Sequence, residues 1–508
     1  MFRPQRLTIG LIEGPTVALF DPTGKNWTPM YRRNPLLSKQ ILMAQLAADG
    51  FDVRLVNLRE GVYQESFGRV PWKEMLIDKV YLGNPIHSID PRSCDAWGIT
   101  ANYMQEREVV SMVVHHVAGH GRPVVVGGSD AISQPDIYFA AGADAVVLDK
   151  TGAATCPVFR HLLRQPSTEP LAGVVFADGP RQAKRARPMS PEEWPLPSVE
   201  IAHRCLGAEY TGEAFIERLL GIGSVFPDIG CDRSCDFCQT PLYRVGYQRM
   251  TSARAIEWLV RQKEAGAGST VMISDQFLTR VLTEQGHRDV LEIMQGARDI
   301  HMPIMWPNGL ELAKATLGRG KVGRDMTPDD ELIQALWGWD GENGTFLAYI
   351  PAERPTTRNT YSKVLPWPEH CEMMRRIVRA GVPVIIYGVI IGLPEDSQED
   401  LLRLESAIRD LHDDLRSINA DLDFQVAVYS ISPIVGTPQW SYVNQAGLLR
   451  FDDPTLVGEF WIASCDTHHL SYQEISDWQL RLAEIGKGKS NLINYHGGLT
   501  GVNSGIIG

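Results

Sequence analysis

Short apolar runs alternate with helix-like segments along most of this chain, and no other feature limits its possible folds as strongly. Strands that alternate with helices are joined by crossover connections and therefore pair in parallel. The pattern predicts a doubly wound, Rossmann-like α/β domain over residues 1–160. Its strands are expected at 6–12, 51–58, 93–101, 123–128 and 144–149.

Residues 161–205 break the pattern, because proline and charge are dense there, and a linker is predicted. Strand and helix alternation resumes after residue 220. About six β/α units predict a partial parallel (β/α)6 barrel over 206–440, with its chemistry on loops at the carboxyl ends of the strands. Residues 441–508 are left as a small C-terminal region, whose glycine-rich end at 494–508 is expected to be a plug or a mobile segment.

The composition narrows the class of protein. Of the 508 residues, 44% are apolar and 22% charged, the profile of an ordinary globular protein. The formal charge of −12 disfavours nucleic acid as a partner. No apolar run approaches the roughly 18 residues of a membrane helix, and the first residues lack a secretory signal. We therefore expect a cytoplasmic protein without a membrane or nucleic-acid partner.

Three of the eight cysteines, Cys231, Cys235 and Cys238, follow the first expected barrel strand with C-x3-C-x2-C spacing. Thiolates are soft ligands that select zinc, copper or iron–sulfur clusters. A structural zinc site would need a fourth ligand at regular spacing, and the nearest histidines, His203 and His287, are distant in the sequence. Three thiolates on four irons leave one iron open, which suits catalysis. A catalytic [4Fe-4S] cluster is the leading hypothesis, and zinc or buried thiols are the alternative.

With Phe237 before its last cysteine, this loop resembles the signature of the radical S-adenosylmethionine (SAM) superfamily. The resemblance implies that SAM binds the open iron and is normally cleaved to a 5′-deoxyadenosyl radical. Later stretches are similar to other motifs of the family, notably GVIIGLPE at 388–395, the segment 348–365 and the strand and turn at 429–438. Asp275 follows the second strand, but the family's Gly-Gly-Glu there is absent, which leaves the contact to the SAM amino group open.

The resemblance assigns roles to individual residues around SAM. Asp275 and Glu353 are implied as catalytic residues. Ribose contacts are expected at the end of the third strand, and adenine contacts along residues 388–395. The implied cofactor-binding residues of the barrel are Phe237, Asn308, Glu311, Lys363, Gly388, Ile390 and Gly392.

The first domain resembles the cobalamin-binding domain that precedes the barrel in one class of these enzymes. Cofactors of such open sheets bind at the carboxyl ends of the strands, where glycine allows close approach. The implied residues are Glu13, Thr16, Thr100, Asn102, Tyr103, Gly127, Gly128, Ser129, Thr151 and Gly152. The Asp-x-His-x-x-Gly motif that supplies histidine to cobalt is absent, and LDKTGAA replaces the usual Gly-Glu-x-Glu turn. A Rossmann-like domain that has lost its cofactor is the alternative.

The segment 57–72 is predicted to be a loop that runs under the corrin ring of cobalamin. Arg69, as a catalytic residue, or Trp72 would occupy the lower face of cobalt there. An arginine cannot coordinate the metal, and a missing axial donor favours methyl transfer. The alternative is that Arg69 is a surface arginine.

These features together predict a cobalamin-dependent radical SAM methyltransferase. A methyl group would pass from SAM through methylcobalamin to a substrate carbon, in natural-product biosynthesis, and an indole or tryptophan-like substrate is compatible with the pattern. The substrate would be a small molecule or peptide, and the reductant an external ferredoxin or flavodoxin. The alternatives are a cobalamin-dependent cyclase or ring-rearranging oxidase, and a non-catalytic iron–sulfur or zinc protein.

Overall fold

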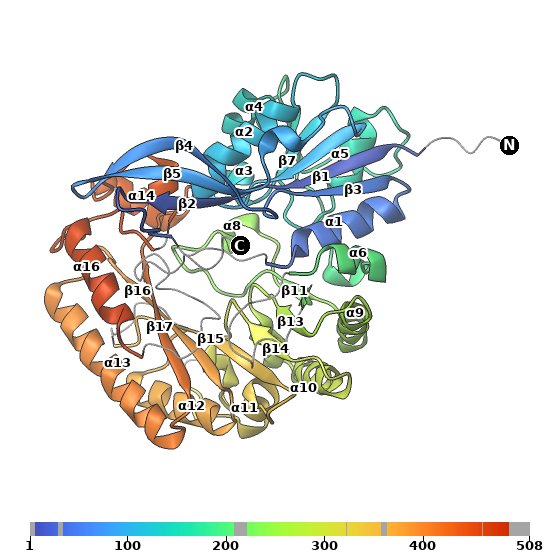
Figure 1. Cartoon of the computed structure of the whole chain (residues 1–508). Coiled ribbons are helices and arrows are strands. Elements are labelled where there is room, and N and C mark those ends of the chain that lie inside the picture. Colours follow the sequence, from blue (N-terminus) through green and yellow to red (C-terminus); the bar gives the residue numbers. More distant parts are fainter. Residues whose placement is uncertain are drawn as a thin grey trace.

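Two six-stranded sheets, each with its own helices, make up most of the molecule (Figure 1). The computed structural model describes residues 6–28, 34–207, 221–321, 323–356, 363–459 and 461–486. The glycine-rich end expected to be a plug or a mobile segment lies outside these residues. No described helix has the length and apolar character needed to cross a membrane.

The first sheet has the strand order β3-β1-β6-β7-β8-β9, and its first five strands are parallel. Helices α2 and α4 pack on one face and α1 and α5 on the other, so the sheet is doubly wound. The strands are β1 (Thr8–Glu13), β3 (Asp52–Asn57), β6 (Ala96–Thr100), β7 (Val124–Gly127), β8 (Ala145–Val147) and β9 (Val174–Phe176). The helices are α1 (Leu37–Ala48), α2 (Arg107–Val117), α3 (Ser129–Ser133), α4 (Pro135–Ala141) and α5 (Thr155–Leu162).

The stretch predicted as a linker is not without structure. It supplies β9, which adds to the sheet antiparallel to β8, and helix α6 (Val199–Arg204). The three-residue apolar run VVF forms β9, but it is too short to indicate a strand among the many prolines and charged residues around it. The segment therefore completes the edge of the first sheet.

A second sheet of the first domain was not foreseen. Its antiparallel strands β2 (Thr16–Phe20), β5 (Met75–Gly83) and β4 (Tyr63–Trp72) lie in the order β2-β5-β4. The predicted loop at 57–72 is therefore wrong, because most of it is a strand that turns through Lys73, at φ 53°, into β5. The sheet packs through Trp72 and Ile77 on Leu456 and Ile462 of the C-terminal region.

The second large sheet has the strand order β10-β13-β14-β15-β16-β17, entirely parallel and in chain order. This confirms the predicted partial (β/α)6 barrel. The strands are β10 (Ile222–Val225), β13 (Ser269–Met272), β14 (Ile304–Trp306), β15 (Thr345–Glu353), β16 (Val384–Ile391) and β17 (Asp423–Ser430). The outer helices are α9 (Ser252–Glu264), α10 (Glu284–Asp299), α11 (Asp330–Trp337), α12 (Trp367–Arg379), α13 (Gln398–Ile418) and α16 (Tyr472–Ala483).

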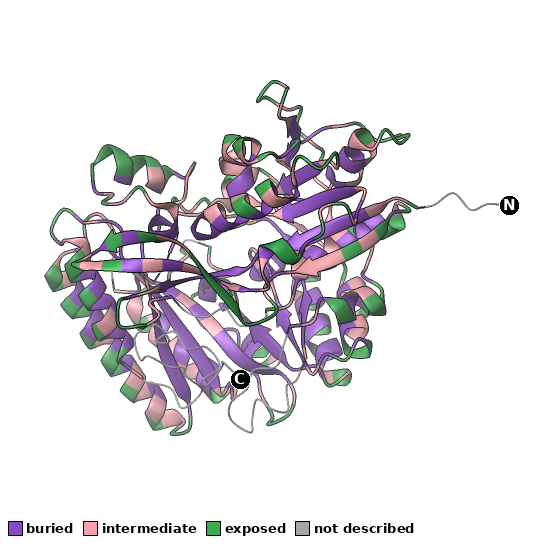
Figure 2. Ribbon diagram, turned by 45° about the horizontal axis from the view of Figure 1, so that its top comes forward, coloured by how far each residue is buried: buried purple, intermediate pink, exposed green. Residues whose placement is uncertain are grey.

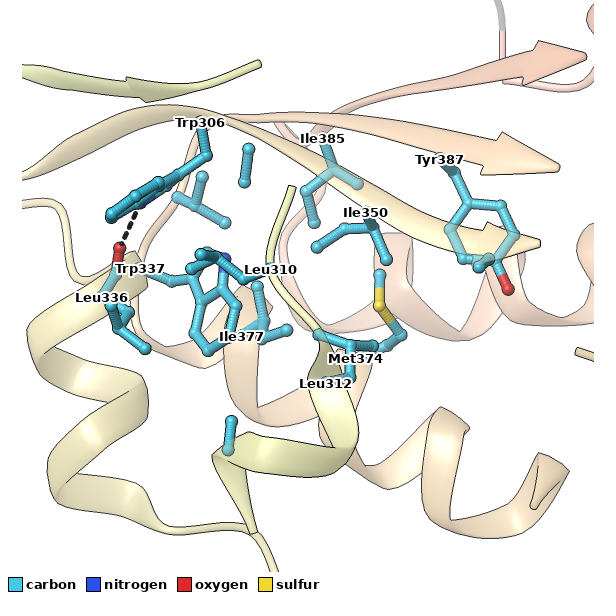
Figure 3. Close-up of a cluster of buried hydrophobic side chains, with 14 of the residues drawn as sticks. Trp306, Leu310, Leu312, Leu336, Trp337, Ile350, Met374, Ile377, Ile385 and Tyr387 are labelled. Carbon is cyan, nitrogen blue, oxygen red and sulfur yellow. Dashed lines mark hydrogen bonds between the residues drawn. The ribbon is translucent and has the colours of Figure 1, made fainter. Parts of the chain in front are cut away.

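The barrel core lies between the sheet and these helices. Trp306 of β14 and Trp337 of α11 fill one end of it, and the Trp306 indole N–H donates to the carbonyl of Leu336 at 3.1 Å (Figure 3). The strands are buried along their length while the helices expose their outer faces (Figure 2). Continuous apolar strands of this kind are typical of parallel sheets covered by helices.

Candidate functional site

Two adjoining cavities lie at the carboxyl ends of the strands. The large cavity, about 840 Å³, is lined by the strand ends of both six-stranded sheets. The small cavity, about 320 Å³, lies within the barrel mouth. Asp275, Asn308, Ser432 and Ile434 line both. A ligand in one cavity is therefore next to a ligand in the other.

Most residues predicted from the cobalamin resemblance meet at the large cavity. Those that line it are Glu13, Thr100, Asn102, Tyr103, Gly127, Gly128, Ser129, Thr151 and Gly152. Thr16 does not, because it begins β2 and is buried where that strand pairs with Leu82. The Tyr103 side chain is 48% exposed, and it faces the cavity.

Glycine at position 128 has a steric reason. Gly128 has φ 116°, in the left-handed region, and a Cβ there would lie 2.4 Å from the carbonyl oxygen of Ala101. Only glycine lets these two strand-end loops close on each other. At this point the large cavity is therefore bounded by backbone atoms of Gly128 and not by a side chain.

Beneath this wall lies a buried charge cluster that the sequence patterns did not reveal. Lys39 Nζ is 2.8 Å from Glu13 and also donates to Thr100. Arg59 reaches Glu13 at 3.3 Å and Glu106 at 2.8 Å. Burial alone would raise the pKa of Glu13, but Lys39 and Arg59 lower it; at Glu106 burial prevails and raises the pKa to about 7. Lys39 sits in an apolar helix with no motif around it, so only the fold places it here.

The large cavity also reaches between the first sheet and helices α1 and α5. Its lining there is apolar and consists of Leu11, Leu42, Gly98, Val125, Val147, Val158 and Phe159. A Cβ on Gly98 would lie 2.8 Å from the Leu11 side chain, so this strand has no room for a larger residue. Among the described residues that line the large cavity there is no histidine.

Arg69 and Trp72 do not lie where cobalamin would bind, so neither fits the predicted role at the lower face of cobalt. Arg69 lies on β4 with 65% of its side chain exposed, and its Nε is 2.6 Å from Asp78. Trp72 is buried against the C-terminal region, and its indole N–H donates to the carbonyl of Ala463 at 3.2 Å. Neither residue lines the large cavity, since the segment is a strand that pairs away from it.

The cysteine loop leaves the barrel after β10 and the short strand β11 (Asp228–Ile229), which pairs with β12 (Gln248–Arg249). Backbone N–H groups of Arg233 and Thr240 each lie 3.4 Å from a sulfur, those of Cys231 and Cys238. Burial raises the pKa of the Cys231 thiol to about 11 and also raises that of Cys235. A bound metal would therefore have to displace their protons.

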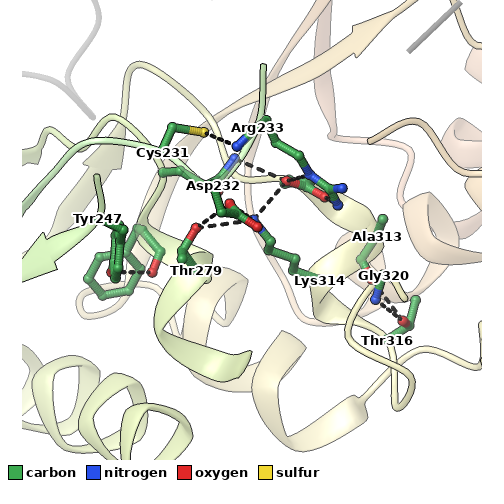
Figure 4. A network of polar contacts seen from close by, with 12 residues as sticks. Cys231, Asp232, Arg233, Tyr247, Thr279, Ala313, Lys314, Thr316 and Gly320 are labelled. Atoms are coloured by element: carbon green, nitrogen blue, oxygen red, sulfur yellow. Dashed lines mark hydrogen bonds and ion pairs between the residues drawn. The ribbon is translucent and has the colours of Figure 1, made fainter. Parts of the chain in front are cut away.

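Polar contacts fix the loop to the barrel (Figure 4). The Arg233 guanidinium pairs with Glu311, and Lys314 Nζ is 3.1 Å from the same carboxylate. Asp232 pairs with Lys314 and accepts from Thr279 Oγ1 at 2.7 Å. Glu311 lines the small cavity as predicted, but its carboxylate is engaged in holding the cysteine loop.

The small cavity gathers most of the residues predicted around SAM. Phe237, Asp275, Asn308, Glu311, Glu353, Lys363 and Ile390 line it. Lys363 pairs with Glu353 and lies 5.5 Å above the Phe237 ring. Asp275 accepts from the N–H of Gly230 at 2.7 Å, and burial raises its pKa.

Gly388 and Gly392 do not line either cavity. A Cβ on Gly388 would lie 2.0 Å from the Tyr349 hydroxyl, so glycine makes room for that ring. Gly392 has φ 77°, and a Cβ there would face Ile475 of α16 at 3.3 Å. At Gly388 the space left by the missing side chain is filled by the Tyr349 ring, and at Gly392 it faces Ile475, so close approach of a ligand ring to these glycines stays a prediction. Within this motif the side chain of Ile390 faces the cavity.

Sequence reasoning missed an aromatic group beside both cavities. Tyr429 lines the small cavity and Trp461 the large one, with ring centroids 4.9 Å apart. His370 also lines the small cavity, 2.8 Å from the Tyr387 hydroxyl, and burial lowers its pKa to about 4. Trp461 lies in the C-terminal region, where no motif drew attention to it.

Ile390→Trp is expected to fill part of the small cavity and weaken SAM binding at least tenfold, about 1.4 kcal/mol, while the iron content stays unchanged. Equilibrium binding of SAM to the cluster-loaded protein measures this. Gly392→Ala is the matched control in the same motif: it should lower stability, because of the positive φ, but leave SAM affinity within about twofold. Weaker binding in the control alone would place SAM against Gly392.

Comparison with solved structures places the fold. OxsB, a cobalamin-dependent SAM radical enzyme with aqua-cobalamin and SAM bound, matches with a TM-score of 0.65 at 14% identity, over 93% of this chain and 66% of that chain. The chain thus spans just under two thirds of OxsB. TsrM from Kitasatospora setae, a radical SAM methyltransferase with cobalamin and a [4Fe-4S] cluster bound, matches with a TM-score of 0.58 at 11% identity, over 94% and 91%.

A second TsrM structure, with tryptophan substrate and the SAM analogue aza-SAM bound, matches with a TM-score of 0.57 at 11% identity, over 94% of this chain and 89% of that chain. No protein-family model and no curated protein matches the sequence. At these identities the likeness establishes the fold alone: a Rossmann-like domain followed by a partial (β/α)6 barrel, as predicted from the sequence.

Proposed function

We propose that this chain is a cobalamin-dependent radical SAM enzyme that moves a methyl group from SAM to a carbon of a small-molecule or peptide substrate. The observation that carries the proposal is the pair of adjoining cavities, which share Asp275 and Asn308. The small cavity is bounded by the cysteine loop and the large one by the strand ends of a Rossmann-like sheet. Two cofactors bound there would be neighbours.

The cysteine loop fits a [4Fe-4S] cluster. Its three thiols follow one barrel strand with C-x3-C-x2-C spacing, and their loop is held by Arg233, Asp232 and backbone donors. When bound, such a cluster supplies an open iron and an electron to SAM. Phe237, with Lys363 above it, would bound the SAM site on the side of the cluster loop.

The large cavity fits cobalamin in its shape and chemistry. Its backbone wall at Gly128 permits close approach, and its apolar extension between sheet and helices suits an aromatic nucleotide tail. When bound, cobalamin supplies a carrier for a methyl group. No described residue of this lining is a histidine, so none of them would supply an imidazole ligand to cobalt.

The share of each solved relative that this chain spans favours methyl transfer over the other reactions. The chain covers 91% of the methyltransferase TsrM but 66% of OxsB. TsrM has been solved with tryptophan, and the aromatic pair Tyr429–Trp461 beside both cavities supports an indole-like substrate here. A cyclase or ring-rearranging oxidase is the second candidate, since OxsB, which has the higher TM-score, is described as a cobalamin-dependent SAM radical enzyme and not as a methyltransferase. The proposal includes an external ferredoxin or flavodoxin as the reductant. It also places the enzyme in natural-product biosynthesis and in the cytoplasm.

SAM carrying a labelled methyl group tests the proposed reaction. Anaerobically reconstituted protein with reductant and candidate indoles should form S-adenosylhomocysteine together with labelled, methylated product. Protein without cobalamin is the control and should form no such product. Product without label, accompanied by a change in ring structure, would favour the cyclase or oxidase instead.

Cob(II)alamin bound to the protein is expected to give an electron paramagnetic resonance spectrum without nitrogen splitting from a histidine. The physical reason is the absence of histidine among the described residues that line the large cavity. Protein labelled with ¹⁵N-histidine checks the assignment, because any splitting that responds to the label comes from a protein imidazole. A label-dependent splitting would contradict the placement of the corrin against this wall.

A further inference from the structure

Two cationic side chains line the large cavity, and only one of them has an ion-pair partner among the described residues. Four carboxylates also line it, and each has a donor within the chain. Glu13 pairs with Lys39 and Arg59, and Asp130 pairs with Arg107 at 2.6 Å. The other two accept from backbone N–H groups: Asp149 from Thr151 and Ala154, and Asp275 from Gly230.

Lys150 is the exception. It follows β8, lines the large cavity, and donates from Nζ to the Ser129 hydroxyl at 2.8 Å. Within the described ranges no carboxylate lies within 4 Å of its Nζ, whereas Arg59, the other cation of the lining, has two. The ring of Tyr243 in α8 (Thr240–Tyr243) lies 5.3 Å away. The carboxylate of Asp275 interacts with the Lys150 ammonium through space, but it lies more than 4 Å from Nζ and forms no ion pair with it.

An ammonium group held in this way lacks an anion. Lys150 is half-buried, and a charge partly withdrawn from water is costly unless it is paired, so that the group otherwise tends to lose its proton. Burial indeed lowers the pKa of Lys150, although Asp275 opposes the shift. An anionic ligand group beside Nζ would restore the charged form and gain a charge-assisted hydrogen bond. Ser129 would orient the ammonium toward it.

We propose that Lys150 binds an anionic oxygen group of the ligand in the large cavity. The inference rests on the proposed function, which supplies two sources of such a group. One is the phosphodiester that links the corrin to its nucleotide tail, and the other is a carboxylate of the substrate. Lys150 is a binding residue for either one.

Cobinamide tests whether the phosphodiester is the anion that Lys150 binds. It keeps the corrin and its amides but lacks the phosphodiester and the nucleotide. Affinities of cobalamin and cobinamide are measured for the full-length wild type, Lys150→Met and Lys150→Arg. If the phosphodiester is the partner, Lys150→Met should weaken cobalamin binding about tenfold or more and leave cobinamide within about twofold. Lys150→Arg should retain most of the affinity, because it keeps the charge.

Acetate and acetamide, added to cobalamin-loaded protein, test whether Lys150 binds a carboxylate of the substrate. A carboxylate beside Lys150 favours its charged form, so acetate should slow reductive methylation of Lys150, measured by peptide mass spectrometry, at least threefold. Acetamide, matched in size but neutral, should not, and chloride at equal ionic strength controls for screening. This result, together with unchanged cobalamin affinity in Lys150→Met, would assign the residue to a substrate carboxylate.

Two outcomes would overturn the inference. Equal weakening of cobalamin and cobinamide would mean that Lys150 donates to neutral corrin amides. No selective effect in either arm would mean that it binds no anion. Failure of the wild type to bind either corrinoid would instead count against the proposed function. Lys150→Met should fold, since it removes an unpaired charge, and its unligated melting temperature checks this.

Discussion

Replacing Cys231, Cys235 and Cys238 together by alanine is expected to abolish the iron–sulfur absorbance and all SAM cleavage. These thiols are the only described cysteines on the loop beside the small cavity, and thiolate is the ligand that iron–sulfur clusters require. The reconstituted wild type should hold about four irons and four sulfides per chain, and the variant close to none. Iron and sulfide analysis with visible absorbance measures the change.

A matched control replaces Cys156 and Cys371, which are half-buried and far from this loop in the sequence. Their loss should leave the iron content unchanged. The folded state of the triple variant is checked by circular dichroism, because the loop is also held by the ion pairs of Asp232 and Arg233. A folded triple variant that still binds four irons would refute the assignment.

Arg280→Met is expected to lower the free energy of unfolding by about 3–5 kcal/mol, because it leaves a buried charge without its partner. Arg280 and Asp228 are both fully buried, with Nε 3.2 Å from the carboxylate. The guanidinium also donates to the carbonyls of Met250 and Pro227, at 2.9 and 2.6 Å. It thereby ties together the strands that frame the cysteine loop, so cluster retention should fall as well.

Arg249→Met is the control; Arg249 lies on β12, next to Met250, whose carbonyl accepts from Arg280. Its guanidinium is 3.3 Å from Asp289 but partly exposed, so its loss should cost about 1 kcal/mol or less. Chemical denaturation of the cluster-free proteins compares the two variants, and iron content after gel filtration measures retention. Equal stability losses would show that the Arg280–Asp228 pair is not the main tie at this loop.

The sequence predicted the two large sheets because their strands are short, apolar and separated by helical periodicity. Each such strand, for example VVVG at 124–127, is buried on both faces and reads as a continuous apolar run. The antiparallel sheet escaped notice because its strands mix polar and apolar residues. β4 has mostly exposed residues, and only Val70 and Trp72 are buried. No local pattern shows what such a ribbon will pack against.

The site residues divide in the same way. Motif matching singled out Phe237, Lys363 and Ile390, which line the small cavity. Ile390 lies on β16, where the two-residue period of a strand fixes which side chains share a face. The first two lie on loops, and their positions depend on the fold. Lys39 and Trp461 lie in no motif, and Lys150 lies in a stretch that departs from the expected motif. Their positions beside the cavity come from elements that meet only in the folded chain.

The contact between the antiparallel sheet and the C-terminal region has a consequence for assembly. Lys79 of β5 pairs with Asp453, and Trp72 bonds to Ala463, on either side of helix α15 (Pro454–Val457). The same stretch contributes Gly458 and Trp461 to the large cavity. A corrinoid in the large cavity would then be covered in part by this segment, which is itself fixed to the antiparallel sheet. We expect release of a bound corrinoid to require the segment to separate from that sheet, so that exchange is slow.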